Sequence, residues 1–201
     1  KIALEDYSVN LDFNELANSY KLNEKNFIIK VNDKIIPFQI YELDNKKNIV
    51  FTVNLKQNET KTIELIYGNE IKQPTFKSRV YAELSMKPTD VYYGKRFRGS
   101  EFKKVQKIKV PEIHTDHDAL FKYEGPGWES ELVGYRFYLD WRNTNDIFGK
   151  KRNELILSTV GVHDTVAKDD SYHSMQEWGM DIFKVGNSLG IGSIGMWAAN
   201  K

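Results

Sequence analysis

The sequence predicts an all-β fold, a β-sandwich built from antiparallel strands. The first reason is that runs of about four to eight residues rich in Ile, Val, Phe and Thr recur between clusters of Asn, Asp and Lys, as in hairpin-connected strands. The second reason is that helical patterning is weak, because no segment combines a long apolar period of about 3.6 residues with caps at both ends. We therefore expect strands to form the core.

The first part of the chain contains several expected strands separated by polar turns. Asn32 and Asp33 are typical turn residues and separate two of these strands. Pro37 lies inside the second strand and indicates a sheet edge or a bulge, because proline has no backbone N–H to donate. The expected strands are residues 27–31, 34–43, 49–53 and 60–67.

A change of composition near residues 68–74 predicts two parts, an N-terminal β lobe over residues 1–76 and a second β segment over residues 77–201. All 4 histidines, all 4 tryptophans and 4 of the 5 prolines follow residue 70. In the second segment, the expected strands are residues 80–86, 101–110, 132–141, 155–162, 180–185 and 189–197, and the best helical candidate is residues 171–178.

Composition excludes several classes of protein. The 201 residues contain no cysteine, which excludes a disulfide scaffold, a thiolate zinc site and a cysteine nucleophile. The balance of 29 basic against 28 acidic residues argues against a nucleic-acid partner, which requires a basic excess. No apolar run approaches the roughly 20 residues that span a bilayer. Because the chain starts at Lys1 rather than Met, we expect an upstream segment to have been removed.

Residues 112–142 are unusually rich in side chains that bind sugars or transfer protons. Histidine and tyrosine can transfer protons when their pKa values are tuned, arginine binds carboxylate or sulfate with paired hydrogen bonds, and aromatic rings stack on sugar faces. The candidate catalytic residues are His114, His117, Tyr135 and Arg142, and the candidate substrate-binding residues are Trp128, Glu129, Arg136, Trp141 and His173. The period of two in a strand places Tyr135 and Arg136 on opposite faces.

The two histidines of this segment leave three interpretations open. His114 and His117, with the carboxylates beside them, are suited to bind zinc or manganese, and His163 or His173 could supply a third imidazole. The same residues also suit catalysis without a metal, or a turn whose backbone they stabilise. We expect no cofactor, with a divalent metal at His114 and His117 left open.

A basic run precedes this segment and is suited to attract an anionic polysaccharide. Only Glu101 opposes it, and its members are Lys95, Arg96, Arg98, Lys103, Lys104, Lys107 and Lys109. The alternative is the solvated face of a strand, because Lys107 and Lys109 alternate with Ile108 and Val110.

Residues 125–131, 133–136 and 140–143, together with 146–150 and 178–182, resemble a bacterial family from polysaccharide-utilisation clusters. The family was formerly of unknown function and includes a dehydratase of ulvan oligosaccharides. The resemblance implies a mutarotase-like β-sandwich and an exported, periplasmic protein. Because family members are longer, it also implies that this chain is the first part of a longer fold.

The resemblance further implies that water is eliminated from an uronic-acid-containing oligosaccharide, which leaves a 4,5-unsaturated uronyl end. This reaction needs a base, an acid and a cation that neutralises the carboxylate. From residue chemistry we assign His114 or His117 as the base, Tyr135 as the acid and Arg142 or Arg136 as the cation, with Trp128 as a stacking platform. The alternatives are a polysaccharide lyase and a non-catalytic module that binds anionic polysaccharide.

Overall fold

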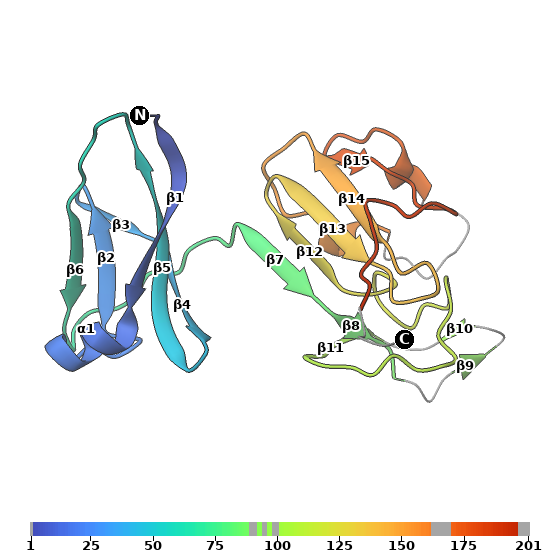
Figure 1. Cartoon of the computed structure of the whole chain (residues 1–201), viewed down its shortest axis with the longest axis horizontal. Helices are drawn as coiled ribbons and strands as arrows, with labels where there is room; N and C mark the ends of the chain where they lie inside the picture. The colour runs from blue at the N-terminus through green and yellow to red at the C-terminus, as the bar shows by residue number, and fades with distance from the viewer. Residues whose placement is uncertain (1, 89–91, 94–95, 98–100, 162–169, 197–201) are drawn as a thin grey trace. The chain divides into compact units, whose positions relative to one another are not determined.

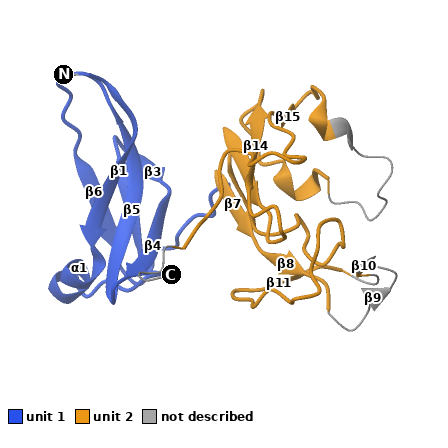
Figure 2. Ribbon diagram, turned by 45° about the vertical axis from the view of Figure 1, so that its right-hand side comes forward, with its two compact units in different colours: residues 1–77 blue, residues 78–201 orange. Residues whose placement is uncertain are grey.

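The computed structural model describes residues 2–88, 92–93, 96–97, 101–161 and 170–196. The chain divides into two compact units, Lys1–Lys77 and Ser78–Lys201 (Figure 2). The division expected from composition lies one residue earlier. Antiparallel sheets dominate both units, so the all-β prediction is confirmed.

Unit 1 is a sandwich of two three-stranded sheets with one helix at its end (Figure 1). One sheet has the order β1-β5-β4 and the other the order β3-β2-β6. The strands are β1 (Leu4–Asp12), β2 (Phe27–Val31), β3 (Lys34–Ile36), β4 (Phe38–Leu43), β5 (Lys46–Leu55) and β6 (Ile63–Tyr67). Alternate residues of β2 and β5, such as Phe27, Ile29, Ile49 and Phe51, meet in a single buried core.

Local chemistry explains where the elements of unit 1 begin and end. Pro37 separates β3 from β4, in place of the single strand expected over residues 34–43. The helix α1 (Phe13–Tyr20) starts at Asp12, whose carboxylate accepts a hydrogen bond from the Glu15 N–H at 3.0 Å. It ends at Lys21, which has the left-handed conformation.

Unit 2 contains a five-stranded antiparallel sheet of order β15-β14-β13-β12-β7. Its strands are β7 (Val80–Glu83), β12 (Gly127–Ser130), β13 (Val133–Phe137), β14 (Asn145–Lys150) and β15 (Gly179–Asp181). Two short pairs complete the strands, namely β8 (Ser85–Met86) with β11 (Lys103–Lys104), and β9 (Tyr92–Tyr93) with β10 (Arg96–Phe97). Two 3₁₀ helices, η1 (Leu157–Thr159) and η2 (Asp170–His173), lie outside the sheet.

Several expected elements of unit 2 differ from the structure. Residues 155–162 are not a strand where they are described and contain η1 instead. No strand occurs in residues 189–196, and of residues 101–110 only β11 is a strand. The helix expected over residues 171–178 is limited to the single turn of η2. Among the described residues, no helix is long and apolar enough to cross a membrane.

Candidate active site

The two faces of the sheet in unit 2 carry different chemistry. On β13, Arg136 is 3% exposed and points to the buried face, whereas Tyr135 points to the other face. Trp128 on β12 pairs with Tyr135, and their rings stack with centroids 5.7 Å apart. Trp128 is 38% exposed, so these two residues form an aromatic platform at the surface.

His114 belongs to a loop that connects the basic segment to β12, which we call the histidine loop, residues 111–124. Three of its non-glycine residues, His117, Ala119 and Glu124, have positive φ, a region that favours glycine. The Asp118 carboxylate holds this conformation by accepting hydrogen bonds from the N–H of Thr115 at 3.0 Å and of Leu120 at 2.8 Å. Backbone strain of this kind gathers at functional sites.

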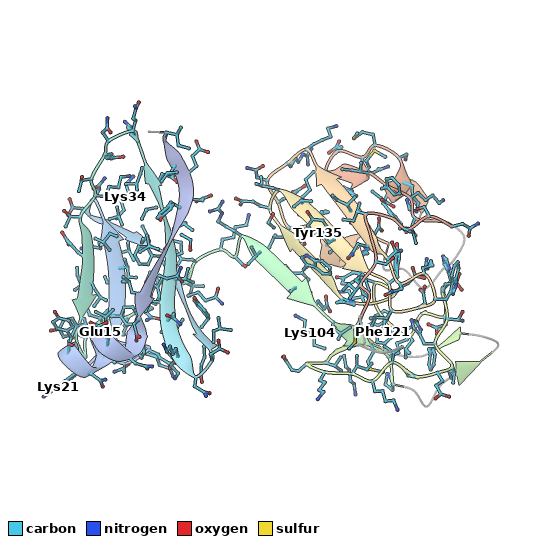
Figure 3. The ribbon with its side chains drawn as sticks, in the orientation of Figure 1. Glu15, Lys21, Lys34, Lys104, Phe121 and Tyr135 are labelled. Carbon is cyan, nitrogen blue, oxygen red and sulfur yellow. The ribbon has the colours of Figure 1, made fainter. Side chains whose placement is uncertain are left out.

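Inside the loop, His114 and Asp118 form a buried pair. His114 Nδ1 lies 2.8 Å from Asp118 Oδ2, and their side chains are 2% and 1% exposed. The ring packs edge-on against Phe121 at 4.9 Å, and Figure 3 shows Phe121 near β8, away from Tyr135. His114 Nε2 is buried and has no hydrogen-bond partner among the described residues. A buried nitrogen without a hydrogen-bond partner lowers the stability of the fold unless water or a ligand forms a hydrogen bond with it.

His117 lies at the surface, where its side chain is 66% exposed. The ring Nδ1 of His117 is 3.3 Å from Asp116 Oδ2 and 3.8 Å from Glu124 Oε1. The backbone N–H of His117 donates a hydrogen bond to Glu124 Oε1 at 2.8 Å. The Trp141 side chain, which is 65% exposed, lies near enough to Asp116 to help lower the pKa of this carboxylate. An exposed imidazole and an exposed indole are thus held by the same carboxylate.

The charges around Asp116 keep it ionised. Burial acts to raise the pKa of Asp116, but hydrogen bonds from Trp141, His117 and Thr115, together with the charge of Arg142, hold the pKa below its ordinary value. The Asp116 carboxylate is therefore a hydrogen-bond acceptor that orients the His117 ring.

Arg142 joins the histidine loop to the turn that follows β13. Its Nε lies 2.8 Å from Asp140 Oδ1, its Nη2 binds Asp140 Oδ2, and Nη2 lies 3.0 Å from Glu124 Oε2. The guanidinium covers the Tyr138 ring at 4.1 Å. Burial acts to lower the pKa of Arg142, but the hydrogen bond and charge of Asp140 and those of Glu124 raise it, so the cation is permanent. The Arg142 side chain is 8% exposed, so the cation lies just below the surface of the site.

Tyr138 contacts both Arg142 and a second, buried cluster of carboxylates. Its hydroxyl donates to Asp146 Oδ2 at 2.9 Å, and Asp146 also shares a hydrogen bond with Asp181. His173 Nδ1 lies 2.6 Å from Asp181 Oδ2. Burial and the neighbouring Asp181 raise the pKa of Asp146 to about 7, so Asp146 is partly protonated near neutral pH.

Two of the expected substrate-binding residues hold the fold together instead. The Arg136 guanidinium lies among the rings of Phe148, Tyr123 and Tyr172 at 4.6–5.7 Å and donates to the Val160 carbonyl. Glu129 is 3% exposed, and its oxygens accept from Lys150 and from two backbone N–H groups at the start of η1. These two residues anchor η1 and the segment after it, so we assign neither to the site.

The structure thus brings together His117, Trp141 and Arg142 around Asp116 and Glu124, with His114 buried in the same loop, and places the other expected residues elsewhere. Tyr135 and Trp128 lie on the opposite sheet face from Arg136, and His173 lies in the buried carboxylate cluster. Sequence patterns did not predict Glu124, Asp140 and Tyr138 as members of the site, and they included Asp116 and Asp118 only as the carboxylates beside the two histidines. Their one signal was the density of carboxylates in residues 112–142.

The structure describes only some of the residues on which the metal hypothesis and the basic-run hypothesis depend. No group of three or more His, Asp or Glu side chains suited to hold a metal ion occurs where the structure is described, and His163 lies outside the described residues. Lys95 and Arg98 also lie outside them, and the side chain of Arg96 is not described. Lys103, Lys104, Lys107 and Lys109 are exposed. Ile108 and Val110, which alternate with the last two, pack with Leu120 and Phe121 of the histidine loop.

Comparison with known protein families places the chain in a family. A family model described as "Domain of unknown function (DUF4861)" matches residues 1–201. No curated protein and no solved structure matches the chain. The arrangement of the described side chains is therefore the basis for any functional argument.

Proposed function

Because the chain belongs to the DUF4861 family of domains of unknown function, its activity is argued from its own residues, and we propose that it eliminates water from an uronic-acid-containing oligosaccharide. The observation that carries this proposal is the pairing of exposed His117 with exposed Trp141 through the shared carboxylate of Asp116. This pairing supplies a proton-transfer group beside a flat apolar surface on which a sugar ring can stack.

His117 is the base of the proposed reaction. A hydrogen bond from Nδ1–H to Asp116 leaves the lone pair on Nε2, so the ring presents its basic nitrogen outward. Nε2 takes the proton from C5, next to the uronate carboxylate. The C5–H electron pair forms the C4=C5 double bond while the C4–O bond breaks. The departing hydroxyl takes a proton from the imidazolium and leaves as water, so the neutral imidazole is restored.

Arg142 is the cation in this proposal. Removal of the C5 proton places negative charge on the uronate carboxylate, and a nearby guanidinium stabilises that charge. Asp140 and Glu124 fix the position of the guanidinium, whose charge acts on the substrate from a side chain that is 8% exposed. Because Asp116, Asp140 and Glu124 make the immediate surroundings acidic, the exposed lysines of residues 103–109 are needed to attract an anionic substrate.

Two residues expected to take part are omitted from the proposal. Tyr135, expected to be the acid, contacts Trp128 on the opposite face of the sheet from Arg136. His114, one of the two expected bases, is buried, so we give it the role of holding the loop through Asp118. A single imidazole that removes and returns the proton makes a separate acid unnecessary when hydrogen and hydroxyl leave from one face.

The test is to incubate the protein with uronic-acid-containing oligosaccharides of the ulvan and alginate types and to analyse the products by mass spectrometry. The expected product has lost one water and absorbs ultraviolet light through its unsaturated uronyl group. We expect His117→Gln to abolish the product without changing thermal unfolding, because the side chain is exposed.

Three other outcomes overturn the proposal. Shortened chains with unsaturated ends identify a polysaccharide lyase. Binding without any product identifies a non-catalytic module. Full activity in a folded His117→Gln variant removes His117 from the mechanism.

A further inference from the structure

Unit 1 contains a cleft of about 410 Å³ that the proposed reaction does not use. It lies where the C-terminal end of α1 meets the end of β6. Its lining includes Tyr20, Lys21, Asn26, Tyr67 and Asn69. In Figure 3, Lys21 lies at the α1 end of the unit and Lys34 at the opposite end.

Two tyrosines give the cleft an aromatic wall. Tyr20 and Tyr67 have ring centroids 6.0 Å apart at an angle of 54°, and they are 51% and 46% exposed. Together the two rings form an exposed aromatic surface beside the cleft. Tilted rings of this kind match the apolar faces of a sugar residue and keep their hydroxyls available for hydrogen bonds.

Lys21 gives the cleft a positive charge without a carboxylate partner among the described residues. Two lysines of unit 1 have carboxylate partners, Lys47 with Glu24 at 2.5 Å and Lys61 with Glu59 at 3.7 Å. What distinguishes Lys21 from the remaining lysines is its place in the lining of the cleft beside Tyr20 and Tyr67. Lys21 has φ +52, which turns the chain at the end of α1. An unpaired ammonium group beside two tyrosines selects for an anionic group on the ligand.

The cleft is formed in advance by hydrogen bonds between its two loops. Gly68 donates its N–H to the Asn26 carbonyl at 2.9 Å, and Ile71 donates to the Gly68 carbonyl at 3.0 Å. Asn26 Oδ1 accepts from the Asn23 N–H at 2.9 Å, which leaves its amide NH₂ group as a donor. Fixed loops reduce the entropy lost on binding.

We propose that this cleft is a binding subsite for an acidic sugar residue of a polysaccharide, separate from the histidine loop. Tyr20 and Tyr67 contact the ring, Lys21 binds the carboxylate or sulfate, and Asn26 and Asn69 bind hydroxyl groups. The subsite retains the polymer and carries out no chemistry. It does not depend on the proposed elimination, because its evidence lies entirely in unit 1.

The test measures binding by calorimetry with the full chain, in a Trp141→Ala background that weakens binding at the histidine loop. The ligands are an oligogalacturonate, a sulfated galactan oligosaccharide and a neutral cello-oligosaccharide. We expect Tyr20→Ala and Tyr67→Ala each to weaken binding of the oligogalacturonate at least about tenfold. Tyr7→Ala, at a residue of β1 that is also 51% exposed, is the matched control and leaves binding unchanged.

Lys21→Ala and its control Lys34→Ala test the charge. Lys21→Ala should weaken only the two anionic ligands, and comparison of these two distinguishes carboxylate from sulfate recognition. Equal affinity for the neutral ligand, or no loss in the tyrosine and Lys21 variants, overturns the subsite. When the same unit 1 substitutions are made in the wild-type chain, with Trp141 retained, the elimination activity on short oligosaccharides is unaffected. The two proposals therefore fail independently.

Discussion

Glu129 and Lys150 form an ion pair in which each side chain is 1% exposed. Lys150 also donates to the carbonyls of Ser130 and Glu154, each at 2.7 Å. Glu129 accepts hydrogen bonds from the N–H groups of Ile156 and Leu157, each at 3.0 Å. The pair therefore joins β12, β14 and the start of η1, and every polar atom in it has a partner.

Replacing Glu129 by glutamine should destabilise the protein strongly. The substitution leaves the Lys150 ammonium buried without its counter-charge, which costs about 3–5 kcal/mol. Urea unfolding measures this loss. The matched control is Glu131→Gln, because Glu131 pairs with Arg79, whose side chain is 52% exposed. That change should cost less than about 1 kcal/mol, and equal losses in the two variants would contradict the argument.

Glu83 should make the protein sensitive to acid. Burial acts to raise its pKa, but hydrogen bonds from Lys122, Ser85 and Tyr81 and the charge of Lys122 hold the pKa at about 2, below the ordinary value of 4.5. A depressed pKa contributes stability that is present above pH 4.5 and lost as the pH falls toward 2. The melting temperature of the wild type should therefore fall across this range. The Glu83→Gln variant should be less stable at neutral pH, and its melting temperature should depend less on pH between 4.5 and 2. If the variant shows the same pH dependence as the wild type, Glu83 is not the source of the acid sensitivity.

The sequence predicted those features that depend on neighbours in the chain. Alternation by two residues placed Tyr135 and Arg136 on opposite faces, and Pro37 indicated the interruption between β3 and β4. β12 and β14 were not expected. β12 contains only four residues, and β14 includes Asn145, Asp146 and Gly149, so neither has the apolar run by which a strand is recognised.

The site itself depends on contacts between distant residues, which no local pattern predicts. Arg142 was expected to be a catalytic residue, as the cation that neutralises the carboxylate, but its pairing with Glu124 could not be read from a spacing of 18 residues. Likewise, Asp146 and Asp181 are brought together only by the register of β14 and β15. Glutamate is a residue type that often binds ligands, and only the burial of Glu129 shows that it holds η1.

Asp146 and Asp181 should make the protein more stable in mild acid than at high pH. Burial and Asp181 raise the pKa of Asp146 from 3.8 to about 7, with Tyr138 and Arg136 opposing this shift. For a raised pKa, the stabilising contribution is full below pH 3.8 and is lost as the pH rises through about 7. Asp146→Asn keeps the shape of the protonated acid without its titration. The variant should gain stability relative to the wild type above pH 7, and a gain confined to lower pH would contradict the raised pKa of Asp146.

The two exposed tryptophans of unit 2 separate the proposed active site from the aromatic platform. Trp141 binds Asp116 beside His117, whereas Trp128 stacks on Tyr135 on the opposite sheet face from Arg136. Trp141→Ala should lower kcat/KM for the elimination about tenfold or more, because it removes the stacking surface and one hydrogen bond that orients Asp116. Trp128→Ala removes a ring of the same size and should change kcat/KM by less than about twofold. Initial rates of unsaturated product give both values. The reverse order would move the substrate from the histidine loop to the sheet platform, where Trp128 was first expected to stack on a sugar.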